Sequence, residues 1–242
     1  LVNDHRGLAG LPSVTENAEW SRGDALHSRY MVENYVIAHS EDPANEFYTA
    51  EGNEAAANGN VYLMAATGYR GTYSDAIEGW MTGPFHMLAI IDPHLARSGF
   101  GEYAKDVDRW HRYGATLDVG RGREALPASV TYPVYYPAPG GHMPHLAYDG
   151  GESPDPLEAC PGYEVPTGPP IALQLGEGDV VPDVTASTLR SGGAAQEHCT
   201  FDETTYPNAY GRAGLGMRDA VVIMPRRPLA TGRTYEVTIE AN

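Results

Sequence analysis

The chain has 242 residues, and its 16 Lys and Arg residues against 32 Asp and Glu residues give a net charge of −16 at pH 7. A chain this acidic repels phosphate at long range, so the charge argues against nucleic acid or an anionic membrane surface as a partner. With 42% hydrophobic and 20% charged residues, we expect a globular protein. No apolar run approaches the roughly 18–20 residues of a membrane span.

The helical patterns lie in the N-terminal half. Trp20, His27, Met31 and Tyr35 recur at spacings that place them on one face of a helix. Between this helix and the next, the chain is polar and rich in Gly and Asn, which predicts a loop with one short helical patch. Thr72-x-x-Asp75 resembles a capping box and starts a later helix. The predicted helices cover residues 17–39, 54–58, 75–81 and 85–91.

The C-terminal half is rich in Pro and Gly, and its β-branched and aromatic residues alternate with polar ones. Alternation with a period of two is typical of half-buried strands. Short strands separated by turn residues favour a small β-sandwich. We expect residues 137–156 to connect two domains. The predicted strands cover residues 115–119, 130–136, 171–175, 220–224 and 235–240.

The start of the chain and its cysteines bear on the compartment. The chain begins at Leu1 without a charged segment followed by an apolar one, so we expect a signal peptide to have been removed. Cys160 and Cys199 are the two cysteines. They form either one disulfide of an exported protein, which would stabilise the fold by roughly 3–4 kcal/mol, or two unrelated buried thiols.

The histidines are the candidates for chemistry, because the sequence has no nucleophile elbow, phosphate-binding loop or His-Glu-x-x-His motif. His142-x-x-His145 lies in a loop of Pro and Gly, where the two rings either share a surface metal ion or are solvated. His27 lies on the helix stripe and is expected in the core. His39 and His86 differ, since each lies at the border between a helix and a polar loop.

Five short motifs, in chain order, resemble the CAP superfamily (cysteine-rich secretory proteins, antigen 5 and pathogenesis-related 1 proteins) in its bacterial, disulfide-free form. The resemblance covers residues 3–136. The motifs are Asn3-x-x-Arg6 with Gly10-Leu11-Pro12, Ala38-His39-Ser40, Asn58-Gly59-Asn60-Val61, Trp80-Met81-x-x-Pro84-Phe85-His86, and Gly99-Phe100-Gly101.

The resemblance implies an α-β-α sandwich around an antiparallel sheet, with a cleft that often holds two His and two acidic residues and, in some members, a divalent metal ion. His39 and His86 match the two histidines, but Gly59 and Gly83 stand where the acidic residues would be.

Two imidazoles fall short of the three or four protein ligands that a stable zinc site needs, and the missing acids leave no obvious general base. We therefore expect His39 and His86 to line a ligand cleft. Either they hold a divalent ion (Zn²⁺, Mg²⁺ or Ca²⁺), or they form hydrogen bonds to water and backbone. In both cases the missing acidic residues disfavour catalysis. An acidic substitute would come from a nearby loop or helix. The candidates for it are Glu46, Glu51, Glu54 and Glu78.

The tail resembles the immunoglobulin-like domains that follow bacterial surface CAP domains. The residues that carry this resemblance are Pro169-Pro170-Ile171-Ala172-Leu173 and Pro228-Leu229-x-x-Gly232-x-x-Tyr235-x-Val237. The expected fold class is α+β, with a CAP-type α-β-α sandwich over residues 1–148 and an immunoglobulin-like β-sandwich over residues 149–242.

The resemblance also implies the function. Some CAP proteins bind sterols and fatty acids, so we expect a secreted or cell-surface binding module for a lipid, sterol, peptide or glycan. Its partners would be such a small-molecule, lipid or glycan ligand, or a cell-surface component. Two alternatives stay open: a structural or adhesive surface protein, favoured by the appended β-domain, and a metal-assisted hydrolase that uses the cleft histidines.

Overall fold

The structure is a computed structural model that describes residues 1–241. The chain folds into two compact units, and each of them takes up several separate stretches of sequence. The first unit comprises Leu1–Asp4, Pro12–Gly79 and Pro93–Pro127. The second unit comprises His5–Leu11, Trp80–Asp92 and the chain from Ala128 onward.

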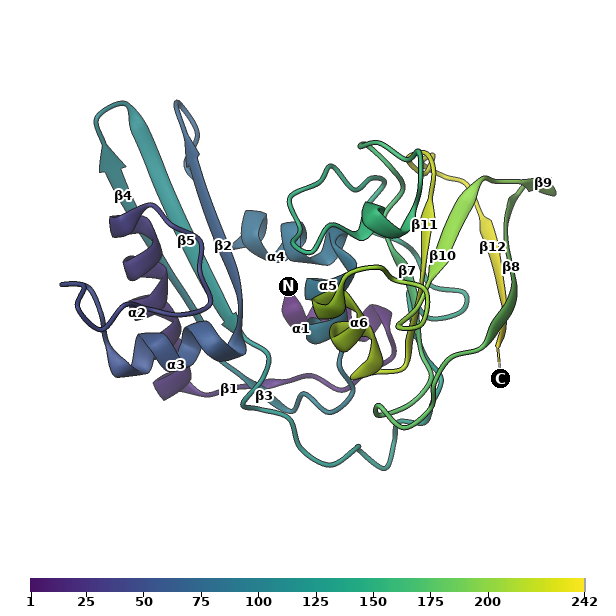
Figure 1. The fold of residues 1–242 in the computed structure, drawn as a ribbon, viewed down its shortest axis with the longest axis horizontal. Helices are drawn as coiled ribbons and strands as arrows, with labels where there is room; N and C mark the ends of the chain where they lie inside the picture. The colour runs from purple at the N-terminus through teal and green to yellow at the C-terminus, as the bar shows by residue number, and fades with distance from the viewer. Residues whose placement is uncertain (242) are drawn as a thin grey trace. The chain divides into compact units, whose positions relative to one another are not determined.

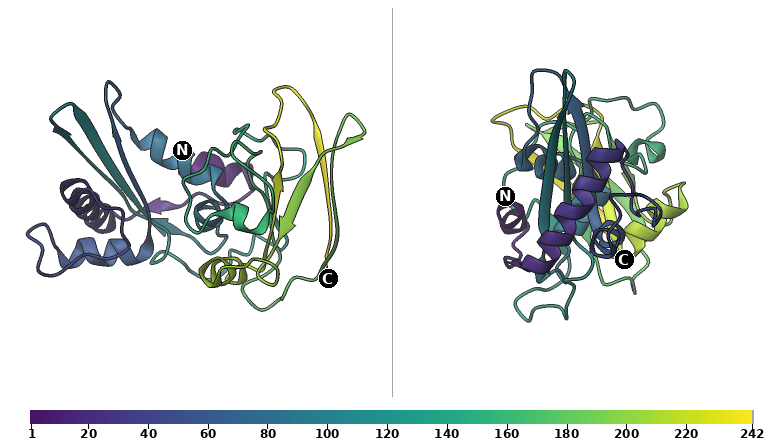
Figure 2. Two further views of the ribbon diagram at one scale, coloured as in Figure 1. Left: turned by 45° about the horizontal axis from the view of Figure 1, so that its top comes forward. Right: turned by 90° about the vertical axis from the view of Figure 1, so that its left-hand side faces the viewer.

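The first unit is built on a three-stranded antiparallel sheet. Strand β5 (Trp110–Asp118) lies in the middle, with β2 (Gly59–Ala66) on one side and β4 (Phe100–Val107) on the other. Helix α2 (Ala18–Asn34) lies across one face of this sheet, as the right-hand view of Figure 2 shows. A short parallel pair joins β1 (Thr15–Glu16) to β3 (Arg97–Ser98).

Helix α2 ends earlier than the sequence predicted. The side chain of Asn17 caps its first turn by accepting hydrogen bonds from the backbone N–H groups of Glu19 and Trp20. At the other end Tyr35 adopts a left-handed conformation, with φ of 52°, and its N–H donates to Met31 O. His39 therefore lies in the loop after the helix and not at the helix end, and Tyr35 is exposed, whereas His27 and Met31 are buried as expected.

Close packing of α2 on the sheet explains the Gly-x-Gly motif. A Cβ on Gly99 would lie 2.6 Å from Ser21 N, and one on Gly101 would overlap the backbone at Ala25. Only glycine allows a strand to approach a helix backbone this closely. The motif is therefore a packing requirement of the α2–β4 contact.

Two further helices bear on the predictions, one in the first unit and one whose last three residues belong to the second unit. Helix α3 (Ala50–Asn58) extends the predicted patch at its N-terminal side, because Thr49 caps it. Helix α4 (Tyr73–Thr82) starts as predicted: Thr72 N donates to the Asp75 carboxylate, and Asp75 N donates back to the Thr72 hydroxyl. Strand β2, by contrast, lies inside the segment that was predicted as loop, since its Gly-Asn start and Ala-Ala end carry no alternation.

The second unit holds two antiparallel sheets (Figure 1). One has the order β10-β11-β7-β6 and the other the order β12-β8-β9. Their strands are β6 (Val134–Tyr136), β7 (Ile171–Gln174), β8 (Val184–Ser191), β9 (Ala194–Ala195), β10 (His198–Phe201), β11 (Ala220–Pro225) and β12 (Tyr235–Ala241). Its helices are α5 (Pro84–Ile90), α6 (Ala209–Gly216), the 3-10 turn η1 (Pro156–Ala159) and the end of α1 (Val2–Leu8), which begins in the first unit.

The predicted strands at 171–175, 220–224 and 235–240 are confirmed as β7, β11 and β12. The strand predicted at 130–136 is confirmed for its last three residues, because Tyr132-Pro133 interrupts it. Strand β6 pairs with β7, so this sheet takes strands from both sides of the predicted division at 148/149. That division, and the immunoglobulin-like form of the tail, stay predictions.

The two cysteines form a disulfide, as one of the two interpretations expected. Cys160 follows η1 and is buried, and Cys199 lies on β10, with 5.6 Å between their Cα atoms. The bond therefore ties the loop before β7 to one edge of the four-stranded sheet. None of the helices within residues 1–241 combines the length and the apolar composition needed to cross a membrane.

Candidate functional site

The site of the second unit is built around His86 at the start of α5. Gly83 is the N-cap of this helix and Pro84 its first residue, which suits the fixed φ of proline. Early N–H groups of a helix lack partners within it. The N–H of His86 donates to Glu152 Oε1 at 2.8 Å, and the same oxygen lies 2.8 Å from His86 Nδ1. One carboxylate oxygen therefore caps the helix and orients the imidazole.

Glu152 occupies the space over Gly83. A Cβ on Gly83 would lie 2.6 Å from Glu152 Cδ and 2.7 Å from its Oε1, closer than real side-chain atoms approach. The position where the CAP resemblance expected an acidic side chain thus holds a carboxylate after all, contributed by a residue later in the chain. Glu152 was not among the glutamates considered as substitutes.

The pair is mostly shielded from water, which strengthens its electrostatics. The side chain of Glu152 is 2% exposed and that of His86 19% exposed. Burial and the nearby negative charge of Glu152 raise the pKa of the Tyr148 hydroxyl, so this phenol stays neutral. Glu152 Oε2 is buried and has no hydrogen-bond partner among the described residues. A buried oxygen of this kind carries a desolvation penalty that a donor would remove.

Gly59 is the second position where the CAP resemblance expected an acidic residue, and packing leaves no room for a side chain there. It links α3 to β2, and a Cβ there would lie 2.8 Å from Thr116 Cγ2 and 2.9 Å from Ala55 O. These are a packed methyl group and a backbone oxygen, which cannot move aside cheaply. Glycine at this position is therefore required by the packing of the first unit.

The two predicted cleft histidines lie in different units. His39 belongs to the first unit, is exposed, and its Nδ1 lies 3.1 Å from Ala56 O. This bond to the backbone is the alternative that the sequence left open for it. His86 belongs to the second unit. A metal ion shared by His39 and His86 stays a prediction.

A buried pair of one histidine and one glutamate, His27 and Glu41, has a structural role in the first unit. His27 Nδ1 lies 2.9 Å from Glu41 Oε1, and its Nε2 lies 2.9 Å from Ala38 O. The other Glu41 oxygen accepts from Thr49 N at 2.9 Å. Both side chains are fully buried, so the pair fastens the loop after α2 to the start of α3. His27 is a core residue, as predicted, and its partner Glu41 was missed.

The second unit also has a hollow of about 230 Å³ near the edge of its sheets. Glu197, Arg226 and Tyr235 line it, and Arg226 is held there by an ion pair with Glu197. Pockets that bury a small ligand usually measure about 300–1,000 Å³. The hollow is therefore small for such a ligand, and none of its lining residues belongs to the His86–Glu152 pair.

Comparison with known proteins addresses the family. Residues 1–110 match the family model of the Cysteine-rich secretory protein family, CAP. The match covers 110 of the 242 residues, a little under half of the chain. The match extends over all five motifs that carried the resemblance, and together with the mixed helix and strand content it supports the α+β class. Glu152 lies outside this region, so the carboxylate at His86 comes from beyond the CAP match.

Two solved structures show a weak likeness. An outer surface protein from Borrelia burgdorferi has 16% identity, with 51% of this chain and 87% of that chain covered and a TM-score of 0.32. An extracellular protein containing a SCP domain from Bacillus anthracis str. Ames has 16% identity, with 47% of this chain and 37% of that chain covered and a TM-score of 0.30. No curated protein matches the chain.

Proposed function

We propose that this chain is an extracellular CAP-type binding protein whose His86–Glu152 pair anchors a ligand that carries hydroxyl groups. The buried Glu152 Oε2 carries the proposal, because it lacks a hydrogen-bond donor among residues 1–241. A sterol or glycan hydroxyl would supply that donor, and His86 beside it is partly exposed. Lipids and peptides, the other ligand classes that the CAP resemblance implies, satisfy this oxygen when they present a hydroxyl or N–H group.

Two further observations support the extracellular assignment. The disulfide between Cys160 and Cys199 is typical of proteins from oxidising compartments. The net charge of −16 suits a soluble surface better than a nucleic-acid partner.

We also propose the immunoglobulin-like form for the sheets of the second unit. Ser187 of β8 bonds to Thr200 of β10 at 2.8 Å, which joins the two antiparallel sheets.

The proposal predicts a loss of binding when Glu152 is neutralised. Purified protein is tested with radiolabelled cholesterol, radiolabelled palmitate and a panel of immobilised glycans. We expect saturable binding of a sterol or glycan probe, and about 10- to 100-fold weaker binding by Glu152→Gln, because a hydrogen bond to a charged group contributes about 1.5–3 kcal/mol. Glu158→Gln, an exposed glutamate of η1, is the matched control and should bind as the wild type does. Absence of binding to every probe, or equal binding by Glu152→Gln, would refute the proposal.

A metal-assisted hydrolase is the second candidate, and the His86–Glu152 contact at 2.8 Å favours it. A carboxylate that orients an imidazole is a common arrangement both for general bases and for metal ligands. Hydrolysis of a chromogenic ester that stops on chelation and returns with Zn²⁺ would favour this candidate. Ligand binding that persists in chelator without turnover would favour the binding protein.

A further inference from the structure

Strand β12 is an open edge of the three-stranded sheet in the second unit. The sheet has the order β12-β8-β9, and β8 pairs with one side of β12 along Tyr235–Ala241. Figure 1 draws β12 in yellow beside β8. No strand within residues 1–241 pairs with its other side. An edge strand directs half of its backbone N–H and C=O groups outward, where a further strand can pair with them.

The other sheet edges of this unit are less suited to pairing. β9 is two residues long, and β6 is three residues long and lies between Pro133 and Pro137. β10 has four residues and carries Cys199 of the disulfide. Short edges and prolines are common protections against strand addition. β12 has neither protection, since it is seven residues long and contains no proline.

One face of β12 is apolar and incompletely covered. Val237 lies opposite the buried Leu189 of β8, and it shares its face of the strand with Tyr235 and Ile239. Val237 is nevertheless 37% exposed, because the sheet ends at β12. An apolar side chain from a strand added at this edge would cover it.

The other face of β12 is acidic. Glu236 and Glu240 are both exposed, and neither forms an ion pair with the residues that the structure describes. Arg190 lies opposite Glu236 on β8, but its Nη1 donates to Gly193 O at 2.9 Å. The two carboxylates are four positions apart along the strand, which is about 13 Å. They favour a partner strand with basic side chains at the same spacing, because opposite charges on neighbouring strands attract.

These charges also disfavour a second copy of the chain at the edge. Antiparallel pairing of β12 with β12 of another copy would place all four carboxylates of Glu236 and Glu240 on one face of the joined sheet. Like charges on neighbouring strands destabilise a sheet, and β12 itself contributes no basic residue to offset them. The occupant that the charges fit is therefore a basic segment.

We propose that β12 binds an extended segment of another protein in which basic residues alternate with apolar ones. Backbone hydrogen bonds along the edge supply the affinity, and pairing of lysine or arginine with Glu236 and Glu240 supplies the specificity. No residue of β12 belongs to the His86–Glu152 pair, so this docking edge does not depend on the ligand proposed for that pair.

The experiment is a titration of a fluorescent nine-residue peptide of alternating lysine and valine with the full chain, followed by anisotropy. We expect saturable binding by the wild type, and about tenfold or greater weakening by the double variant Glu236→Lys, Glu240→Lys. The double variant Glu158→Lys, Glu164→Lys is the matched control. It reverses two exposed glutamates outside this sheet, so it changes the net charge equally and should bind as the wild type does. Circular dichroism checks that each variant is folded.

A second peptide separates strand pairing from simple attraction to an acidic protein. With proline in place of every valine, the peptide keeps its charge but loses half of its backbone donors and cannot pair as a strand, so we expect at least tenfold weaker binding. The proposal would be overturned by no binding of the lysine–valine peptide, by equal binding of the proline peptide, or by equal weakening in the two double variants. Sedimentation velocity should show a monomeric wild type. A wild-type dimer whose association changes with the charge reversal on β12 would place a second copy at the edge and also overturn the proposal.

Discussion

Replacement of Asp24 by asparagine is expected to stabilise the protein at pH 8. It should also remove the loss of unfolding free energy that ionisation of Asp24 causes in the wild type between pH 5 and pH 8. Asp24 lies on α2 and is fully buried against the sheet of the first unit. Neither of its carboxylate oxygens has a hydrogen-bond partner in the described chain. Burial, and then the negative charge of Asp118, raise the pKa of Asp24 to about 8, while Arg121 opposes the shift.

The direction of the pH effect follows from proton binding. The unfolded chain releases the proton of Asp24 near pH 3.8, whereas the folded chain retains it up to about pH 8. The contribution of this group to stability is therefore fully present below the unfolded pKa and is lost as the pH rises toward 8. At about 1.4 kcal/mol per pH unit, the loss between pH 5 and pH 8 is roughly 4 kcal/mol. Asparagine does not titrate and removes this slope.

Urea unfolding at pH 5, 6, 7 and 8, followed by circular dichroism, measures the effect. The difference between Asp24→Asn and the wild type should grow with pH. Glu19→Gln, which changes an exposed acidic residue of the same helix, should follow the wild-type curve. Parallel curves for Asp24→Asn and the wild type would show that Asp24 is already ionised in the folded chain.

Arg6→Ala is expected to destabilise the second unit by about 3–5 kcal/mol, because it removes a buried guanidinium group that is hydrogen-bonded to backbone carbonyl groups. Arg6 is 1% exposed, and its Nη1 donates to Ile90 O and to Asp92 O, each at 2.8 Å. Burial lowers its pKa to about 10, and the charge of Asp92 opposes that shift. Alanine would leave two buried carbonyl groups short of a donor and open a cavity.

Denaturant unfolding of Arg6→Ala, Arg6→Lys and Arg22→Ala tests this role. Lysine keeps the charge but lacks the planar guanidinium, so we expect it to recover part of the loss. Arg22 is 72% exposed and pairs with Glu51 on the surface, so its removal should change the unfolding free energy by at most about 0.5 kcal/mol. A loss below about 1 kcal/mol for Arg6→Ala would contradict the buried role of Arg6.

The sequence predicts best those elements whose ends carry local signals. The Thr72–Asp75 cap and the Gly83-Pro84 step placed α4 and α5 correctly. The end of α2 was wrong, because Tyr35 closes the helix in a left-handed conformation that tyrosine rarely adopts. Strand β2 was missed because pairing with β5, and not its own pattern, makes it a strand.

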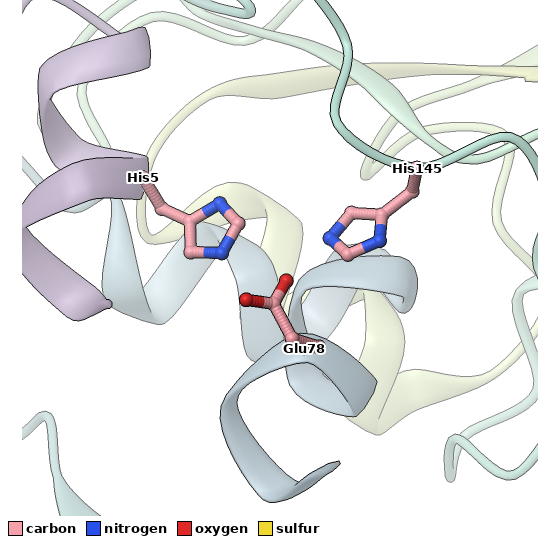
Figure 3. Close-up of side chains that lie close together, drawn as sticks. All are labelled: His5, Glu78 and His145. Carbon is pink, nitrogen blue, oxygen red and sulfur yellow. The ribbon is translucent and has the colours of Figure 1, made fainter. Parts of the chain in front are cut away.

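The candidate sites were less predictable because their residues are far apart in the sequence. His86 was found through a motif resemblance, but nothing in the Pro- and Gly-rich loop marks Glu152 as buried over Gly83. His145 was considered only together with His142, since His5 comes close to it through the packing of α1 against the loop after β6 (Figure 3). The sequence does not show which side chain fills the space next to a glycine, because that side chain can come from a distant part of the chain.

The central claim is that the Glu152 carboxylate fills the space over Gly83 and binds His86. A double-mutant cycle of Gly83→Ala and Glu152→Ala, read by denaturant unfolding, tests it most directly. The added methyl group should displace Glu152 in the first variant and meet no obstacle once Glu152 is truncated. The account predicts that the losses of unfolding free energy in the two single variants add up to about 1–3 kcal/mol more than the loss in the double variant. Losses that add within about 0.5 kcal/mol would show that Glu152 does not occupy this space.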